Sequence, residues 1–431
     1  MREMKDSGID WIGTIPQDWQ LSKIGSLYTQ RNEKVSDKDY QPLSVTMQGI
    51  LPQLATAAKT DDGDNRKLVR VGDFAINSRS DRRGSCGISP LDGSVSLINI
   101  ILTPRTAMHP GYYNWLFHTT LFADEFYKWG HGIVADLWTT RWQEMKSITV
   151  PVPEYAEQER IAAFLDAECA EIDAVLEKTR ASIEEYKKLK QAVITQVVTK
   201  GIRGDRPMKN SGIEWIGDIP AEWKVASIGR FCFVTKLAGF EFTNDMMSNI
   251  QDSGDIPIVR AQNIKMGKFI NNISEFIPYR ISQKLERCAL NRKCLIITFI
   301  GAGIGEVAIF NEPKRYHLAP NVAKIVINVG MEHFVTEEYL LYFLMSFAGQ
   351  EEINKIKKAT AQPSLSMGTI RSIKMVLPDS IEEQSEIVSY LDMRCASIDA
   401  LIAKKQQYLI EIENYKKSLI YEYVTGKKEV V

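Results

Sequence analysis

Three arginines stand close together in the stretch Asn-Ser-Arg-Ser-Asp-Arg-Arg-Gly-Ser, which occupies residues 77–85 after a predicted strand. Guanidinium groups bind phosphates and guanine edges in a bidentate manner. With the small hydrogen-bonding residues around them, these arginines can position a nucleic-acid backbone and read bases from one loop. The candidate contacts are Asn77, Ser78, Arg79, Ser80, Arg82 and Arg83. The pattern also fits a solvated polar hairpin that binds nothing, and the sequence leaves both interpretations open.

Two further groups of polar residues lie on predicted strands and suit the same chemistry. Asn and Gln side chains pair with adenine, and Arg and Lys side chains pair with guanine. The candidates are Arg260, Gln262, Asn263 and Lys265 in the second half of the chain, and Ser44, Thr46 and Gln48 in the first. Because polar strand ends are common in proteins, these residues are candidate DNA contacts and do not form a diagnostic motif.

The glycine-rich stretch Gly301–Gly305 follows an apolar run and invites comparison with a dinucleotide-binding turn. That fingerprint needs the spacing Gly-x-Gly-x-x-Gly and a helix after it. Here the spacing differs and residues 306–310 have the composition of a strand, which predicts a tight turn between two strands. The sequence also contains no Gly-x-x-x-x-Gly-Lys-Ser/Thr phosphate loop and no Asn/Asp-Pro-Pro-Tyr motif of amino-methyltransferases.

The titratable residues form no catalytic or metal-binding motif. The five histidines are isolated, without a His-Glu-x-x-His or nucleophile-elbow pattern. The six cysteines form no Cys-x-x-Cys pair, which predicts buried thiols in a reducing compartment. Glu185-Tyr186-Lys187 matches a nuclease Glu-x-Lys, but no acidic partner on a preceding strand accompanies it. We therefore expect a binding protein without a catalytic residue, a metal or a cofactor of its own.

Short strands and a helix must position the polar residues in each of two modules. β-branched residues flanked by Gly, Asp or Pro predict the strands. In the first module they are Tyr40–Gln48, Lys67–Val71, Asp73–Asn77 and Val95–Leu102, followed by a helix over Tyr112–Thr120. In the second they are Ile256–Ile264, Cys294–Ile300, Glu306–Phe310 and Ala323–Ile327, followed by a helix over Glu337–Phe347. The common order indicates one fold used twice.

An internal repeat supports this duplication. The segment Asp6–Trp19 returns 204 positions later as Asn210–Trp223, with Trp, Gly, Pro and Trp at matching places. Because indole rings bury large apolar areas and Gly and Pro fix turns, the segment predicts a clip that folds against a larger body. The modules also end alike, at residues 146–153 and 371–378. Their interiors differ, as two binding specificities on one scaffold would require.

A long amphipathic helix is predicted after each module. Residues 157–199 and 383–425 contain neither Pro nor Gly, and apolar residues recur at steps of three, four or seven. The two stretches are related, since Cys169-Ala170 returns as Cys395-Ala396, 226 positions later. We expect the two helices to pack on each other.

Charge is unevenly distributed, although the formal net charge of the chain is −1. Residues 20–150 carry 15 Lys and Arg against 13 Asp and Glu, and residues 224–378 carry 19 against 13, whereas both helical stretches are acidic. This favours contact of the modules with a polyanion and contact of the helices with protein. Glu168, Thr179 and Ser182 interrupt a strict heptad in the first helix, which leaves surface for other subunits.

The totals are those of an ordinary globular protein. Hydrophobic residues make up 44% and charged residues 25% of the sequence. Its 431 residues predict two to four domains. The N-terminal residues lack the apolar core of a signal peptide, and no run of about 18 apolar residues occurs. We expect a cytoplasmic protein without membrane contact.

Four motifs, each present twice and in the same order, resemble the specificity subunits of type I restriction-modification enzymes. They are the clip Gly-Ile-Asp/Glu-Trp-Ile-Gly-x-Ile-Pro-x-x-Trp, the module exit Ile-x-Val/Met-x-Val/Leu-Pro, the Glu-Gln at each helix start, and Val-Thr-Lys-Gly or Val-Thr-Gly-Lys at each helix end. The resemblance covers essentially the whole chain. Because module interiors vary freely in this family, it assigns no base-contacting residue.

The resemblance implies a mixed α/β (α+β) fold with a pseudo-twofold internal repeat. A target recognition domain with its clip would occupy residues 1–153, a central conserved helix 154–203, a second target recognition domain 204–378, and a C-terminal conserved helix 379–431. The two helices would form an antiparallel coiled coil that sets the spacing of the two domains. Each domain would read one half of a bipartite, asymmetric target in double-stranded DNA.

The resemblance also implies partners. The chain would recruit two methyltransferase subunits and two ATP-dependent restriction/translocase subunits. S-adenosylmethionine, ATP and Mg would be bound by those partners and not by this chain. On the residues alone two other functions stay open: a coiled-coil scaffold that never binds DNA, and a stand-alone DNA modification enzyme. The scaffold predicts no salt-dependent DNA binding, whereas a DNA-reading subunit predicts a strong salt dependence.

Overall fold

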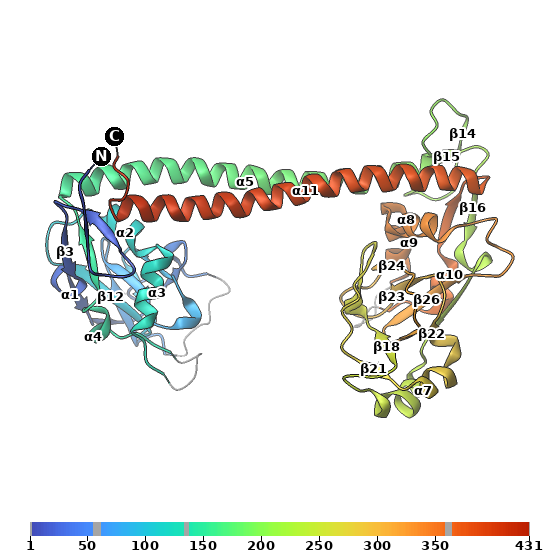
Figure 1. Ribbon diagram of the computed structural model, residues 1–431, viewed down its shortest axis with the longest axis horizontal. Helices are drawn as coiled ribbons and strands as arrows, with labels where there is room; N and C mark the ends of the chain where they lie inside the picture. Colours follow the sequence, from blue (N-terminus) through green and yellow to red (C-terminus); the bar gives the residue numbers. More distant parts are fainter. Residues whose placement is uncertain (1, 55–61, 133–137, 358–363, 431) are drawn as a thin grey trace. The chain divides into compact units, whose positions relative to one another are not determined.

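The computed structural model describes residues 2–54, 62–132, 138–357 and 364–430, and the chain divides into two compact units (Figure 1). Unit 1 consists of Met1–Arg180 and Gln406–Val431, and unit 2 of Ala181–Lys405. Each unit contains one clip, one module and a part of both long helices. The two units divide within the long helices, and the domain boundaries at residues 153, 203 and 378 stay a prediction.

Unit 1 is built mainly from short strands. They are β1(Met4–Asp6), β2(Thr14–Pro16), β3(Gln20–Lys23), β4(Tyr28–Arg31), β5(Lys34–Val35), β6(Leu43–Thr46), β7(Gly49–Pro52), β8(Arg66–Val69), β9(Phe74–Asn77), β10(Cys86–Ile88), β11(Gly93–Val95), β12(Asn99–Pro104) and β13(Thr149–Val152). Its helices are α1(Ile24–Leu27), η1(Ser80–Arg82), α2(Pro110–Phe117), α3(Thr120–Lys128), α4(Trp142–Met145) and parts of α5(Tyr155–Lys200) and α11(Ile381–Val424).

Unit 2 repeats this plan with different insertions. Its strands are β14(Met208–Asn210), β15(Asp218–Pro220), β16(Lys224–Ser227), β17(Cys232–Lys236), β18(Ile256–Val259), β19(Ile264–Lys265), β20(Lys268–Phe269), β21(Phe276–Ile277), β22(Ala289–Leu290), β23(Cys294–Thr298), β24(Val307–Phe310), β25(Tyr316–Leu318), β26(Val322–Ile327) and β27(Lys374–Leu377). Its helices, besides the remainder of α5 and α11, are η3(Ile228–Arg230), α6(Gly239–Glu241), η4(Phe242–Met246), η5(Met247–Asn249), η6(Ala261–Asn263), α7(Tyr279–Lys284), η7(Glu286–Cys288), α8(Glu337–Met345), α9(Phe347–Ile356) and α10(Met367–Ser372).

Each unit contains a four-stranded antiparallel sheet of the same topology. Its strand order is β4-β12-β9-β10 in unit 1 and β17-β26-β23-β24 in unit 2. In both units the strand that follows the clip pairs with the strand that ends the module, β3 with β13 and β16 with β27. A helix packs on the same edge strand in each unit, α2 on β10 and α8 on β24. The smaller second sheets differ, because β18 and β25 pair in parallel in unit 2 while β8 has antiparallel partners in unit 1.

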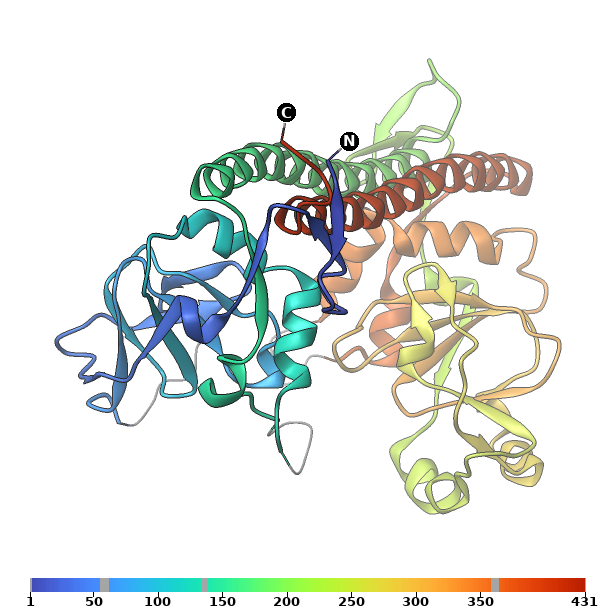
Figure 2. The ribbon, with the colours of Figure 1, turned by 60° about the vertical axis from the view of Figure 1, so that its left-hand side comes forward.

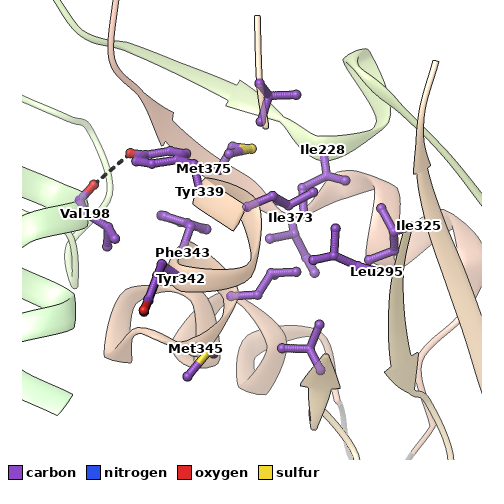
Figure 3. Packing of buried hydrophobic residues seen from close by; sticks show 14 of the residues in the cluster. Val198, Ile228, Leu295, Ile325, Tyr339, Tyr342, Phe343, Met345, Ile373 and Met375 are labelled. Carbon is purple, nitrogen blue, oxygen red and sulfur yellow. Dashed lines mark hydrogen bonds between the residues drawn. The ribbon is translucent and has the colours of Figure 1, made fainter. Parts of the chain in front are cut away.

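Strand β23 shows why this part of the sequence reads as a continuous apolar run. Successive side chains of a strand point to opposite faces of the sheet. Leu295 and Ile297 face a core that contains α8, whereas Cys294 and Ile296 face a second core beneath β18 and β25. Because both faces are covered, every residue of the strand is buried. Figure 3 shows the first of these cores, where Leu295 lies among side chains from α8 and the neighbouring elements.

The two long helices pack on each other within each unit, as Figure 2 also shows for the start of α5 and the end of α11 in unit 1. The ion pair Lys416–Asp173 (2.6 Å) in unit 1 has its counterpart in Lys190–Asp399 (2.6 Å) in unit 2, 226 positions away for both partners. A buried tyrosine of the module binds the end of one helix in both units. Tyr112 Oη donates to Val424 O at 2.8 Å, and Tyr339 Oη donates to Val198 O at 3.1 Å (Figure 3).

Several predicted elements of the modules differ from the structure, among them the following three. The predicted strand Val95–Leu102 is two strands, β11 and β12, because the chain turns where Asn99 N donates to Ser96 O (3.1 Å). The predicted strand Ile256–Ile264 ends at Val259, and η6 follows it. The predicted helix Tyr112–Thr120 ends at Phe117, because the side chain of Thr119 caps the next helix.

The cysteines are buried and free, as the sequence predicts. Burial raises the pKa of the Cys169 thiol to about 11 and that of the Cys86 thiol to about 12, so neither is a nucleophilic thiolate at neutral pH. Within the described residues, no group of His, Cys, Asp and Glu side chains is placed to hold a metal ion. Among the described helices, none combines the length and the apolar character needed to cross a membrane.

Candidate nucleic-acid interface

The arginine loop, residues 77–85, connects the antiparallel strands β9 and β10 at the edge of the sheet in unit 1. Its ends are joined by a hydrogen bond from Asn77 N to Ser85 O (2.9 Å), and η1 forms its middle. Gly84 has a φ of +75°, in the left-handed region that glycine adopts without steric cost. The loop is therefore a defined turn.

The first two residues of the loop shape it. Asn77 and Ser78 are each 6% exposed. Asn77 Oδ1 accepts the backbone N–H of Arg79 (3.0 Å), and Ser78 Oγ donates to Ile98 O (2.5 Å). Because these polar groups are buried and already paired, Asn77 and Ser78 hold the loop in shape and are not exposed contacts.

The three arginines and Ser80 have different surroundings. Arg82 lies 3.7 Å from Asp81, and Arg83 forms an ion pair with Asp124. Arg79 is exposed, and within the described residues no carboxylate lies within ion-pair distance of its guanidinium. Ser80 is partly buried at the start of η1. Of the three arginines in this loop, Arg79 is therefore the one whose guanidinium has no ion-pair partner among the described residues.

The strand candidates in unit 1 lie in a hairpin. Thr46 Oγ1 donates to Gly49 O (2.9 Å) and accepts the N–H of Gln48 (3.1 Å), while Ser44 Oγ accepts the N–H of Leu54 (3.2 Å). Ser44 and Thr46 thus stabilise the hairpin of β6 and β7. Gln48 is exposed at its tip, where a side chain can reach a ligand.

The candidates in unit 2 also divide into buried and exposed residues. Asn263 is 2% exposed, and its Nδ2 donates to Ile270 O (3.0 Å) and to Asn272 O (3.1 Å). Arg260 Nε donates to Glu275 Oε2 at 2.6 Å. Asn263 therefore holds a turn, and Arg260 is neutralised by a carboxylate. The remaining candidates of this set, Gln262 and Lys265, are exposed.

A structural equivalence connects the arginine loop to the glycine-rich stretch of unit 2. Ile76 pairs with Cys86 in unit 1 and Ile297 pairs with Val307 in unit 2, so residues 77–85 and 298–306 are loops of equal length at the same place in the sheet. Gly305, at the position of Gly84, also has a positive φ (+91°). The predicted turn between two strands is confirmed.

The equivalent loops share their backbone plan and differ in side chains. Thr298 N donates to Glu306 O (2.9 Å), as Asn77 N does to Ser85 O. An isolated bridge joins Arg79 to Thr139 in unit 1, and Ile300 to Ser364 in unit 2. In this alignment the arginine positions 79, 82 and 83 correspond to Ile300, Gly303 and Ile304. The loop of unit 1 therefore has three arginines at positions where the loop of unit 2 has two isoleucines and a glycine.

A pocket of about 370 Å³ lies beside the arginine loop in unit 1. It is lined by Gln30, Lys67, Ser78, Arg79, Leu97, Ile98, Ile100, Thr139, Thr140, Arg141 and Trp142. Lys67 Nζ donates to Asn99 O (2.7 Å), and burial lowers the pKa of this ammonium group. The sequence prediction included only Arg79 and Ser78 from this lining. Lys67, Arg141 and Trp142 belong to no local motif, and only the fold brings them together.

The architecture is that of a two-module mixed α/β protein, and comparisons with known proteins define its class. A chain of a structure describing complex assembly and conformational transition of the type I restriction-modification system matches with a TM-score of 0.73 and 13% identity, over 96% of this chain and 99% of that one. The HsdS subunit from Thermoanaerobacter tengcongensis matches with a TM-score of 0.51 and 15% identity, over 96% and 98% of the two chains.

Sequence comparisons agree with the fold. The family model of the type I restriction modification DNA specificity domain matches residues 220–414. The type I restriction enzyme MjaVIII specificity subunit of Methanocaldococcus jannaschii is 24% identical over 96% of this chain and 94% of its own. The EcoKI specificity subunit of Escherichia coli is 21% identical over 96% and 90%. Over nearly its whole length the chain is therefore similar to the specificity subunits of type I restriction enzymes.

Proposed function

We propose that this chain selects the DNA target of a type I restriction-modification complex. Each module reads one half of a bipartite, asymmetric sequence in double-stranded DNA. One observation carries the proposal: the loops 77–85 and 298–306 have the same length and the same place in the sheet but different side chains. Because base readout depends on side-chain chemistry, the two half-sites differ in sequence.

The exposed candidates are the contacts we propose to the DNA. In unit 1 they are Arg79, Arg82, Arg83 and Gln48, with Ser80 beside them; in unit 2 they are Gln262 and Lys265. The buried candidates Ser78 and Asn263 support the turns on which these side chains stand. The paired arginines, such as Arg260 with Glu275, must give up or share a carboxylate to bind DNA, which reduces their contribution.

The long helices supply the two other functions of such a subunit. We propose that α5 and α11 form an antiparallel coiled coil that fixes the spacer between the half-sites. We propose that the same helices recruit two methyltransferase subunits and, through the assembled complex, two restriction/translocase subunits. Large apolar side chains remain exposed on the helices and support this docking role. They are Val175, Leu189, Met393, Leu401, Tyr408, Ile410 and Tyr415.

Catalysis in this proposal resides in the partners. S-adenosylmethionine, ATP and Mg are bound by the methyltransferase and restriction subunits, and the chain described here contributes the choice of sequence. This division agrees with the absence from the sequence of the phosphate-loop and amino-methyltransferase motifs.

The decisive experiment is to produce the chain together with its methyltransferase partner and to map the methylated bases on a DNA of random sequence. The expected result is one bipartite motif with two unlike halves and a spacer of fixed length. A single contiguous palindrome, or methylation by the purified chain alone, would contradict the proposal. Omission of the chain from the mixture is the matched control and should abolish sequence preference.

A further inference from the structure

The pocket beside the arginine loop brings together cations that have no ion-pair partner among the described residues. Lys67, Arg79 and Arg141 all line it. Within the described residues, none of the three has a carboxylate within ion-pair distance, whereas Arg82 and Arg83 of the same loop are both paired. Like charges gathered without counter-charges destabilise a protein unless an anion binds among them. The arrangement therefore points to an anionic ligand.

The remaining lining limits the kind of anion. Leu97, Ile98 and Trp142 give the pocket an apolar and aromatic wall beside its cations. A small inorganic anion would leave this wall without a partner, whereas a phosphodiester carries a sugar and a base that can cover it. Lys67 keeps donor capacity for the anion, because its Nζ bears three N–H groups and donates one of them to Asn99 O.

We propose that this pocket binds a phosphodiester group of the DNA backbone in the half-site read by the first module. Arg79 and Arg141, on either side of the bridge between Arg79 and Thr139, bind the phosphate oxygens. The ammonium group of Lys67 adds a third positive charge to the pocket. Leu97 and Trp142 pack against the attached sugar. The inference rests on the proposed function and adds Lys67, Arg141 and Trp142 to the DNA-binding residues of this chain.

Among the described residues, two of these three cations have no basic counterpart at the corresponding place in unit 2. The bridge Ile300–Ser364 replaces Arg79–Thr139. Arg141, which precedes α4, corresponds to Ser366, which precedes α10 and accepts the N–H of Thr369 (3.0 Å). The bridge and the helix that follows it match in the two units, so the positions can be compared directly. Ile300 and Ser366 stand where unit 1 has Arg79 and Arg141, so two of the three cations are replaced. The phosphate clamp belongs to the first module alone.

The test measures binding of the full chain, in complex with its methyltransferase partner, to a duplex library of random sequence over a series of salt concentrations. Arg79→Ala and Arg141→Ala should each weaken binding about tenfold at low salt and make the slope of log K against log salt shallower by about one. Arg70→Ala is the matched control. Arg70 lies in the same unit, is partly exposed and is paired with Asp92 at 2.9 Å, so this variant changes the net charge equally and should leave the slope unchanged.

The outcomes separate this inference from the proposed function. If the wild-type complex shows no salt-dependent DNA binding, the proposed function fails. If the wild type binds but Arg79→Ala and Arg141→Ala match it, or if Arg70→Ala weakens binding as much as they do, the pocket is not a phosphate site. Thermal midpoints within about 2 °C of the wild type establish that the variants are folded. If an alanine variant does not fold, Arg79→Lys or Arg141→Lys replaces it; the slope should then be kept, with affinity lowered by loss of the bidentate contact.

Discussion

At the residue scale, one carboxylate, buried in unit 2 and partly buried in unit 1, attaches each clip to a long helix. Glu383 Oε2 accepts the indole N–H of Trp223 at 3.1 Å, and Glu383 Oε1 accepts from Arg206 at 2.7 Å. Glu157 makes the same two kinds of contact in unit 1, with Trp19 at 2.9 Å and with Arg2. The repeated Trp of the clip is thus explained by a hydrogen bond as well as by its apolar area.

Loss of the Glu383 carboxylate should destabilise unit 2. Glu383→Ala removes one of the two carboxylates that pair with the partly buried Arg206, which keeps Glu222 at 2.8 Å, and leaves the Trp223 indole without an acceptor. We expect a loss of about 2 kcal/mol in the free energy of unfolding. Glu383→Gln keeps an acceptor and should cost less. Glu386→Ala removes the exposed pair with Arg203 and, as the control, should cost less than about 1 kcal/mol. Urea unfolding measures all three; equal midpoints for Glu383→Ala and Glu386→Ala would contradict this role.

At the scale of elements, the long helices separate a packing face from an exposed face. Leu391 is 0% exposed in the core of unit 2, while Leu401, ten residues later on the same helix, is 44% exposed. Leu391→Ala should lower the free energy of unfolding by about 2–5 kcal/mol, because it opens a cavity in a packed core.

Leu401→Ala is the matched variant on the exposed face. It should change stability by less than about 0.5 kcal/mol and weaken co-purification of the methyltransferase subunit. Urea midpoints and a pull-down with the tagged partner measure the two effects. A Leu401→Ala variant that binds its partner as tightly as the wild type would remove this part of α11 from the docking surface.

The long helices and clips could be predicted because their signals are local. Helical periodicity over more than forty residues and a repeated Trp-Gly-Pro-Trp pattern do not depend on distant residues. The strands of the modules are harder to predict from sequence. The turn at Ser96, for example, contains no Gly or Pro; it is held by two hydrogen bonds that the side chain and the backbone N–H of Asn99 donate to Ser96 O. The division into β11 and β12 therefore had no visible signal.

At the scale of the whole molecule, the repeat relates the units more closely than the sequence shows. The arginine loop and the glycine-rich loop are equivalent in the sheet, yet they share almost no residues, so no sequence comparison of the halves aligns them as a functional pair. The candidate site was only partly predictable for the same reason. Arg79 was found because its neighbours are arginines, whereas Lys67 and Arg141 come from distant strands and loops that meet in the pocket.

The repeat has a consequence for the order of the chain. In unit 2 the end of α5 continues through Gly201, whose φ is +74°, into the second clip, where Arg206 binds Glu383. In unit 1 the end of α11 continues through Gly426, whose φ is +70°, and both Tyr421 and Lys427 donate hydrogen bonds to Ile12 O of the first clip. The glycine after each helix lies beside the second Trp of a clip, Gly201 beside Trp223 and Gly426 beside Trp19, whether or not the helix and the clip are joined in sequence.

A chain with residues 206–427 first, then a copy of the linker 202–205, then residues 2–203 should therefore fold into the same two units. The copied linker would lead from Lys427, which keeps its hydrogen bond to Ile12 O, to Arg2. Arg2 stands 204 positions before Arg206, and it binds Glu157 as Arg206 binds Glu383. Opening the chain between residues 203 and 206 removes only exposed linker contacts, so we expect a thermal midpoint within about 5 °C of the parent and the same methylation motif with the partner subunit. A permuted chain opened instead between Arg82 and Arg83 breaks the loop that joins β9 and β10 and should lose preference at one half-site. If the first permuted chain is insoluble, or selects a different motif, the equivalence of the two helix–clip junctions is wrong.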